Sequence, residues 1–186
     1  MKLRAIAGVV FFTVASLTYA QSNMGLKGGL NFSTISPGGN SNQSLRTGFH
    51  SGLLWHIPLA QGIAFQPELV YSLQGTKLSN DAKLNLGYIN APFLLQAMVG
   101  HGFRLEAGPQ LGFLVSAKTQ SGNMLENVRQ GYKTIDAALA VGFGFAGKVG
   151  LGFDFRYNYG LSNISKSGGD VTNRVFQVGL FYQFRH

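Results

Sequence analysis

Apolar and polar residues alternate with a period of two along eight segments of the chain, a spacing typical of β-strands with two unlike faces. Segment 149–160 shows it most clearly, because every odd position from Val149 to Tyr159 is aliphatic or aromatic. Its even positions carry small or polar residues such as Gly150, Asp154 and Arg156. The pattern predicts strands at residues 24–35, 46–57, 63–74, 84–99, 103–118, 133–146, 149–160 and 173–184.

The connections between these strands alternate strictly in length. Long connections follow every odd-numbered strand, at residues 36–45, 75–83, 119–132 and 161–172. Short connections follow the second, fourth and sixth strands, at residues 58–62, 100–102 and 147–148. Outer-membrane barrels separate long extracellular loops from short periplasmic turns in this way, whereas a soluble sandwich does not. The predicted fold is therefore all-β, an eight-stranded antiparallel up-and-down transmembrane β-barrel.

The surrounding lipid decides which face points where. Lipid offers the backbone no hydrogen-bond partners, so the sheet must close and its apolar face must point outward. The polar positions then line an interior that is narrow enough for side chains to fill. Pro67, Pro92 and Pro109 fall inside predicted strands, and we expect an irregularity at each because proline cannot donate to a sheet ladder.

Composition supports this class and excludes others. Only 12% of the 186 residues are charged, 26 are glycine and none is cysteine, with a formal net charge of +8. The missing cysteines exclude a disulfide scaffold, a cysteine-ligated zinc site and thiol catalysis. No apolar run is long enough for an ordinary transmembrane helix. A glycine-rich, aromatic-rich and charge-poor chain of this kind is typical of a barrel in a Gram-negative outer membrane.

Residues 1–20 have the three parts of a cleaved secretory signal peptide. Lys2 and Arg4 give a basic start, residues 5–17 are apolar, and small residues precede a cleavage position after Ala20. The alternative is a buried N-terminal helix. We expect export, with residues 21–186 as the barrel domain.

The inward positions carry charges of both signs. They are Lys27, Arg46, Arg104, Lys118, Arg156, Glu68, Glu106, Asp136 and Asp154. We expect a paired polar network in the lumen, because buried charges are tolerated when they are paired and hydrogen-bonded. Its predicted members are Glu68, Arg104, Glu106, Asp154 and Arg156. The alternative is a proton or ion path. His50 and His56 share this face without a third ligand, so no metal or other cofactor is expected.

Four basic residues fall at the extracellular ends of the predicted strands, namely Arg46, Lys118, Lys133 and Arg174. Basic side chains at this height can pair with the phosphate groups of lipopolysaccharide while their stems lie along the apolar wall. Arg174 is the best candidate, because it shares the lipid-facing parity of its strand. The alternative is ordinary solvation of the rim.

Motifs for catalysis and nucleotide binding do not fit the strand pattern. His50 and Ser51 are neighbours in a strand and point to opposite faces, so they cannot act as base and nucleophile. The glycine pattern at 142–147 resembles a dinucleotide fingerprint but is followed by a strand instead of a helix. Basic residues are scattered instead of clustered, which argues against nucleic acid. We expect no catalytic residues and no enzyme activity.

Several motifs resemble the PorT-like outer-membrane β-barrel family of Bacteroidetes. They are GLKGGLNFS at 25–33, TGFH at 47–50, FQPELVYS at 65–72, YINAP at 88–92, LEAGPQLGF at 105–113, FRYNYGL at 155–161 and NRVFQVGL at 173–180. The resemblance covers the mature chain in order and includes the three prolines. The resemblance implies an outer-membrane location, and it carries over no site residues. One member of the family is tied to protein secretion and gliding.

These features favour a non-enzymatic integral outer-membrane protein, either structural or an accessory subunit of an envelope assembly. A narrow channel for ions or small solutes is the alternative, and a lipid-modifying enzyme is less favoured. The expected partners are outer-membrane lipid and lipopolysaccharide, and an envelope or secretion-complex protein. The aromatic last strand, with Phe176, Tyr182 and Phe184 on one parity, also resembles the signal that the barrel-assembly machinery reads during insertion.

Overall fold

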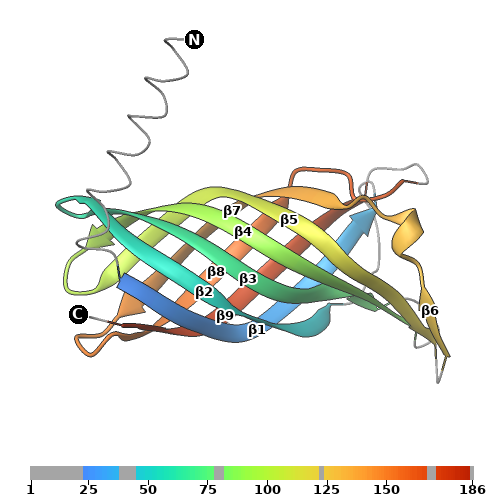
Figure 1. Cartoon of the computed structure of the whole chain (residues 1–186), viewed down its shortest axis with the longest axis horizontal. Coiled ribbons are helices and arrows are strands. Elements are labelled where there is room, and N and C mark those ends of the chain that lie inside the picture. The colour runs from blue at the N-terminus through green and yellow to red at the C-terminus, as the bar shows by residue number, and fades with distance from the viewer. Residues whose placement is uncertain (1–22, 38–44, 78–81, 122–123, 167–170, 185–186) are drawn as a thin grey trace, which may run out of the picture.

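The computed structural model describes residues 23–37, 45–77, 82–121, 124–166 and 171–184, and most of them form one closed antiparallel sheet (Figure 1). Consecutive strands pair along the sheet, and the last strand pairs with the first to close the ring. The strands of the ring are β1 (Asn23–Pro37), β2 (Arg46–Ala60), β3 (Ile63–Lys77), β4 (Lys83–Val99), β5 (Phe103–Ser121), β7 (Ile135–Ala146), β8 (Leu151–Gly160) and β9 (Val171–Gln183). The predicted eight-stranded barrel is thus confirmed.

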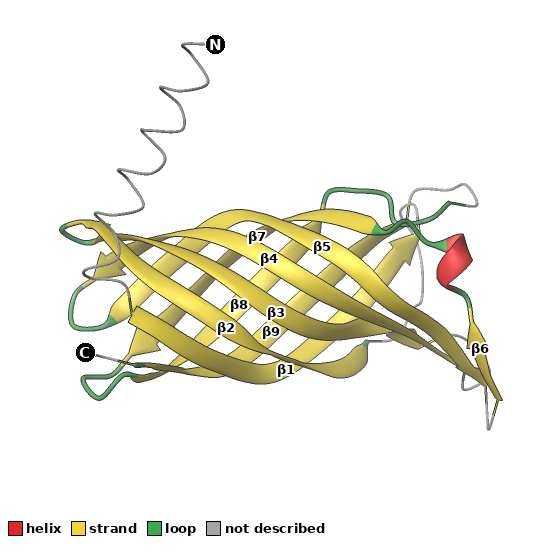
Figure 2. Ribbon diagram, viewed as in Figure 1, coloured by secondary structure: helices red, strands yellow, loops and turns green. Residues whose placement is uncertain are grey.

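Two short elements lie outside the ring, at one end of the barrel (Figure 2). Strand β6 (Met124–Asn127) pairs only with the end of β5, and the 3-10 helix η1 (Arg129–Gly131) follows it. Both belong to the connection between β5 and β7, which is one of the predicted long loops. No helix among the described residues is long and apolar enough to cross a membrane.

The two faces of the sheet separate as the alternation predicts. In β8, Leu151 and Phe153 are exposed by 53% and 43%, whereas Asp154 and Arg156 are exposed by 3% and 1%. The apolar side chains therefore form the outer wall, where lipid replaces water as the solvent. The charged side chains point into the barrel.

The three prolines interrupt the ladder on one side only. Pro67, Pro92 and Pro109 pair with residues of β4, β5 and β7, respectively. On the opposite side of each proline, the ladder lacks residue pairs but keeps its register. These ladders are β2–β3 at Pro67, β3–β4 at Pro92 and β4–β5 at Pro109. A proline ring has no N–H to donate, so the irregularity at each position is a gap in the ladder.

A register shift in the β4–β5 ladder changes the facing of one predicted site residue. Tyr88 pairs with Leu114, but the preceding Gly87 pairs with Ser116, so β5 contains one extra residue. Such a bulge reverses the parity of the strand beyond it. Lys118, which uninterrupted alternation placed in the lumen, is exposed as a result.

An apolar cluster fills the interior near the extracellular ends of the strands, where a polar lining was expected. Its buried members are Ile35, Leu84, Leu86, Tyr88, Leu114, Ala117 and Ile164. Ile164 comes from the β8–β9 connection and is 0% exposed. The expectation of a polar interior throughout was wrong here, because this loop residue covers the cluster and lets apolar side chains be buried away from water.

Candidate functional site in the lumen and at the outer rim

Arg156 on β8 lies at the centre of the lumen between two carboxylates. Its Nη1 and Nη2 donate to the two oxygens of Glu68 at 2.8 and 2.9 Å. Its Nε donates to Glu106 Oε1 at 2.9 Å, and Nη2 lies 2.8 Å from the same oxygen. The guanidinium fork therefore joins β3, β5 and β8 across the barrel with charge-assisted bonds, which are stronger than neutral ones.

Lys27 extends this cluster to a third carboxylate. Its Nζ lies 3.3 Å from Glu68 Oε2 and 3.0 Å from Asp154 Oδ2, and its side chain is 1% exposed. Lys27 is an inward charge in the sequence pattern, but the predicted network does not include it. Its position four residues into β1 gave no sign of its partners, because β3 and β8 approach it only once the barrel has closed.

Arg104 is in the lumen but takes no part in an ion pair among the described residues. Its Nη1 lies 3.4 Å from both Gln66 Oε1 and Gln96 Oε1. Its guanidinium carbon lies 4.2 Å from the centroid of the Phe181 ring, in the position of a cation–π contact. The structure thus brings together four of the five predicted network residues and holds Arg104 beside them through amides and a ring.

A second group of polar side chains lies nearer the extracellular ends of the strands. Asn31 is at its centre, where its Nδ2 donates to Ser72 Oγ at 2.9 Å and its Oδ1 accepts from Gln177 Nε2 at 2.9 Å. His50 Nδ1 lies 2.8 Å from the same Asn31 oxygen. We call this the amide group; its members are Asn31, His50, Ser72, Gln74, Asn158, Asn173 and Gln177.

The other candidate acids and histidines have ordinary structural partners. Asp136 accepts a hydrogen bond of 2.6 Å from Ser162 Oγ, at the start of the β8–β9 connection. His56 Nδ1 lies 3.1 Å from Gln96 Oε1. Within the described ranges, no three histidine, aspartate or glutamate side chains gather in a way that could hold a metal ion.

The four predicted rim residues divide into two kinds. Arg46 Nη1 donates to the backbone oxygen of Gln74 at 2.9 Å, so its side chain is engaged on the inner face of the wall. Lys118 and Lys133 are exposed. Arg174 is on the outward parity of β9, with its guanidinium carbon 5.5 Å from the centroid of the Tyr159 ring. Its Nε is buried and has no hydrogen-bond partner among the described residues.

The loops at this end form a polar pocket of about 460 Å³, lined by Asn127, Arg129, Gln130, Tyr132, Thr134 and Lys166. Two loops build it, because Lys133 N donates to Ile164 O at 2.8 Å and Lys166 N donates to Gly131 O at 3.0 Å. Burial raises the pKa of the Tyr132 phenol above its ordinary value, so its hydroxyl stays protonated. Sequence reasoning missed this pocket, because its basic residues come from separate loops.

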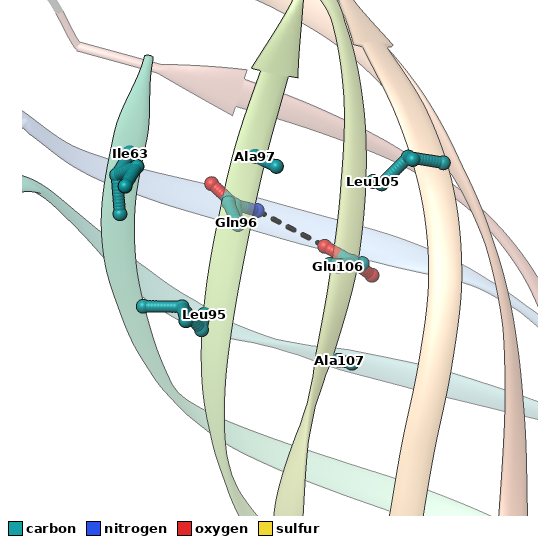
Figure 3. A pocket seen from close by; sticks show the side chains of 7 residues that line it. All are labelled: Ile63, Leu95, Gln96, Ala97, Leu105, Glu106 and Ala107. Carbon is teal, nitrogen blue, oxygen red and sulfur yellow. Dashed lines mark hydrogen bonds between the residues drawn. The ribbon is translucent and has the colours of Figure 1, made fainter. Parts of the chain in front are cut away.

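The outer wall also has an apolar hollow of about 240 Å³ between β3, β4 and β5 (Figure 3). Ile63, Leu95 and Leu105 surround the hollow. The side chains of Ala97 and Ala107 are too small to fill it. It lies on the lipid-facing parity, and hydrocarbon chains suit such a surface.

The closed ring, apolar wall and filled lumen define a small β-barrel of the bacterial outer-membrane type. Residues 19–166 match the family model described as outer membrane protein beta-barrel domain, and the chain belongs to this family. It is thus an outer-membrane β-barrel protein.

Several solved structures have a similar fold, and two of them are compared with this chain. Neisserial surface protein A aligns with a TM-score of 0.64 and 14% identity, over 87% of this chain and 97% of that one. Ail is the attachment invasion locus protein of Yersinia pestis, crystallised in complex with the heparin analogue sucrose octasulfate. It aligns with a TM-score of 0.57 and 17% identity, over 88% of this chain and 99% of the Ail chain. At such identities the likeness shows the fold alone. No curated protein matches the chain.

Proposed function

We propose that this protein is a non-enzymatic, non-conducting outer-membrane barrel that acts through its surfaces, as a structural or accessory subunit of an envelope assembly. The observation that carries the proposal is the salt-bridged cluster across the lumen. Lys27, Glu68 and Arg156 expose 1% or less of their side chains, and each contacts a charge on another strand. The apolar cluster at the extracellular end adds a second barrier to ions.

Planar-bilayer recording tests the closed lumen. The purified protein is expected to give no steady conductance steps after insertion. A change in the gel migration of the reconstituted protein on heating shows that the barrel is folded and inserted, so that its silence is not failed insertion. Reproducible ion-selective steps from the natural protein would establish the channel function instead.

We further propose that the extracellular end binds the phosphate groups of lipopolysaccharide. Arg174 supports this, because its guanidinium lies on the lipid-facing side beside the Tyr159 ring, where it can pair with a phosphate oxygen. Lys118 and Lys133 are exposed at the same end. The complex of Ail with a polysulfated saccharide offers a precedent for anionic sugars on a barrel of this shape.

Glycolipid retention during purification tests this partner. Replacing Lys118, Lys133 and Arg174 together with Gln should reduce the lipopolysaccharide that co-purifies in mild detergent. Lys148→Gln removes one positive charge from a turn at the opposite end and is the control for position, to be compared with each single Gln substitution at the rim. If the triple variant retains as much glycolipid as the natural protein, the basic rim is merely solvated.

The proposed bacterial source, protein partner, assembly route and export of this protein rest on its sequence motifs. The PorT-like resemblance supports a Bacteroidetes source and a protein partner in the envelope, such as a secretion complex. The outward parity of Phe176, Tyr182 and Phe184 supports recognition by the barrel-assembly machinery, and residues 1–20 support export through a signal peptide. Affinity purification from native outer membrane tests the protein partner, which should co-purify in a defined ratio.

A further inference from the structure

Two glycines separate His50 from Asp154 in one row of paired residues across four neighbouring strands. His50 on β2 pairs with Gly29 on β1, Gly29 pairs with Gly179 on β9, and Gly179 pairs with Asp154 on β8. Gly179 faces the lumen, and a Cβ added to it would lie 3.0 Å from His50 Nε2 and 3.0 Å from Asp154 Oδ1. The two polar atoms thus approach the same point above the glycines.

Both atoms are buried and have no hydrogen-bond partner among the described residues. His50 is 1% exposed and Asp154 is 3% exposed. The opposite ends of these groups are occupied, because Asp154 Oδ2 contacts Lys27 Nζ at 3.0 Å and His50 Nδ1 contacts Asn31 Oδ1 at 2.8 Å. Buried polar atoms of native proteins are almost always hydrogen-bonded, so these two require a partner.

The contacts of Asn31 show what kind of partner His50 needs. Asn31 Nδ2 donates to the backbone oxygens of Phe49 and Leu73 at 3.0 and 2.9 Å, so the amide oxygen is the atom that faces the imidazole. His50 Nδ1 must therefore carry the hydrogen, and in the neutral ring Nε2 is an acceptor. Asp154 Oδ1 is an acceptor as well. A ligand between them has to donate two hydrogen bonds.

We infer that a buried water molecule binds above Gly29 and Gly179 and donates to His50 Nε2 and Asp154 Oδ1. A buried water needs two or more polar partners in a polar site, and His50 Nε2 and Asp154 Oδ1 accept the two hydrogen bonds that one water can donate. A cation suits the site less well, because Glu68, Glu106 and Asp154 around it are already balanced by Lys27, Arg104 and Arg156, while the fourth buried acid, Asp136, is hydrogen-bonded to Ser162.

This water connects two networks that no direct hydrogen bond or ion pair joins among the described residues. On one side is the charged cluster, which Lys27 extends to Asp154. On the other is the amide group, which His50 enters through Asn31. With the water in place, hydrogen bonds run without interruption from Glu106 to the polar residues nearer the extracellular end.

Gly179→Ala is the direct test. The nearest backbone atom to the added methyl group is the Gly28 oxygen at 3.4 Å, so the barrel should still close, but the methyl group occupies the space of the water. Gly28→Ala is the matched control, because its added Cβ meets nothing closer than the His50 backbone oxygen at 3.6 Å. Each variant adds one methyl group, at Gly28 on β1 or at Gly179 on the neighbouring strand β9.

The readout is nitrogen-15 NMR of the histidine side chains in detergent micelles or nanodiscs. The natural protein should show His50 as the Nδ1–H tautomer, with a cross-peak between its ring and a bound water. Gly179→Ala should lose the cross-peak and unfold at a lower urea concentration, whereas Gly28→Ala should change neither. A protonated Nε2 in the natural protein, or a cross-peak that survives Gly179→Ala, would overturn the inference. A crystal structure with a metal ion between the two atoms would also overturn it.

Discussion

Replacing Arg156 by Gln should destabilise the barrel strongly, because this side chain pairs with two buried carboxylates in the lumen. Glu68 and Glu106 contact it at 2.8 to 2.9 Å, and all three side chains are 2% exposed or less. Removing one partner of a buried ion pair costs about 3–5 kcal/mol, since the remaining charge stays buried without compensation. With a urea m-value of about 2 kcal/mol/M, the unfolding midpoint should fall by about 2 M.

Trp55 provides the assay, because it is the only tryptophan of the chain and lies on the outward parity of β2. Its fluorescence reports the transfer from lipid to water as the barrel unfolds in urea. Arg104→Gln is the matched control, since it removes the same charge from the same lumen at a site without an ion pair among the described residues. Its loss should be about 2 kcal/mol, the magnitude of a desolvated cation–π contact, because Arg104 is buried.

A second substitution distinguishes loss of pairing from loss of packing. Arg156→Gln with Glu106→Gln removes one charge of each sign, so the remaining buried charges balance again. The double variant should recover more than half of the lost midpoint. An Arg156→Gln midpoint equal to that of the natural protein would refute the reasoning, because it would indicate a wet lumen in which charges are screened. Equal losses for the Arg156 and Arg104 variants would refute the central role of the Arg156 contacts.

Three further predictions concern the barrel as a whole. The folded protein should migrate differently on gels before and after heating, and recovery in a soluble periplasmic fraction would contradict membrane insertion. Deleting residues 176–186 should abolish insertion in a pulse-chase fractionation, because β1 and β8 would lose their partner and leave open edges in lipid. Backbone amide hydrogen exchange in nanodiscs should be faster at Leu69 and Leu94, beside the proline gaps, than at Val178 in the continuous β8–β9 ladder. Equal protection of these amides would mean that the gaps are closed.

The position of the three prolines shows how far local reasoning reaches. Because proline lacks a donor whatever surrounds it, the sequence was enough to predict an irregularity at Pro67, Pro92 and Pro109. Which neighbouring strand loses its pairing depends on the direction in which the missing N–H would point. That direction follows from the register of the closed sheet, which the order of residues along one strand does not contain.

The sequence by itself determined the number of strands, their order and the facing of most residues, because a strand has a period of two and the apolar parity must meet lipid. It also determined that the lumen carries charges of both signs. Only the tertiary structure decided that Arg156 meets Glu68 and Glu106, and that His50 approaches Asp154. These contacts join strands far apart in the chain, and they depend on the stagger that the closed ring imposes.

The tertiary structure also decided the facing of Lys118 and the apolar filling of the extracellular end. One extra residue in β5 reverses the parity beyond it, and no local pattern marks which strand contains the extra residue. Ile164 lies in a loop, where sequence periodicity is silent, yet it covers the apolar cluster because two loops pair through their backbones. Local periodicity decides the direction of a side chain, whereas its neighbours are set by chain closure, register and loops.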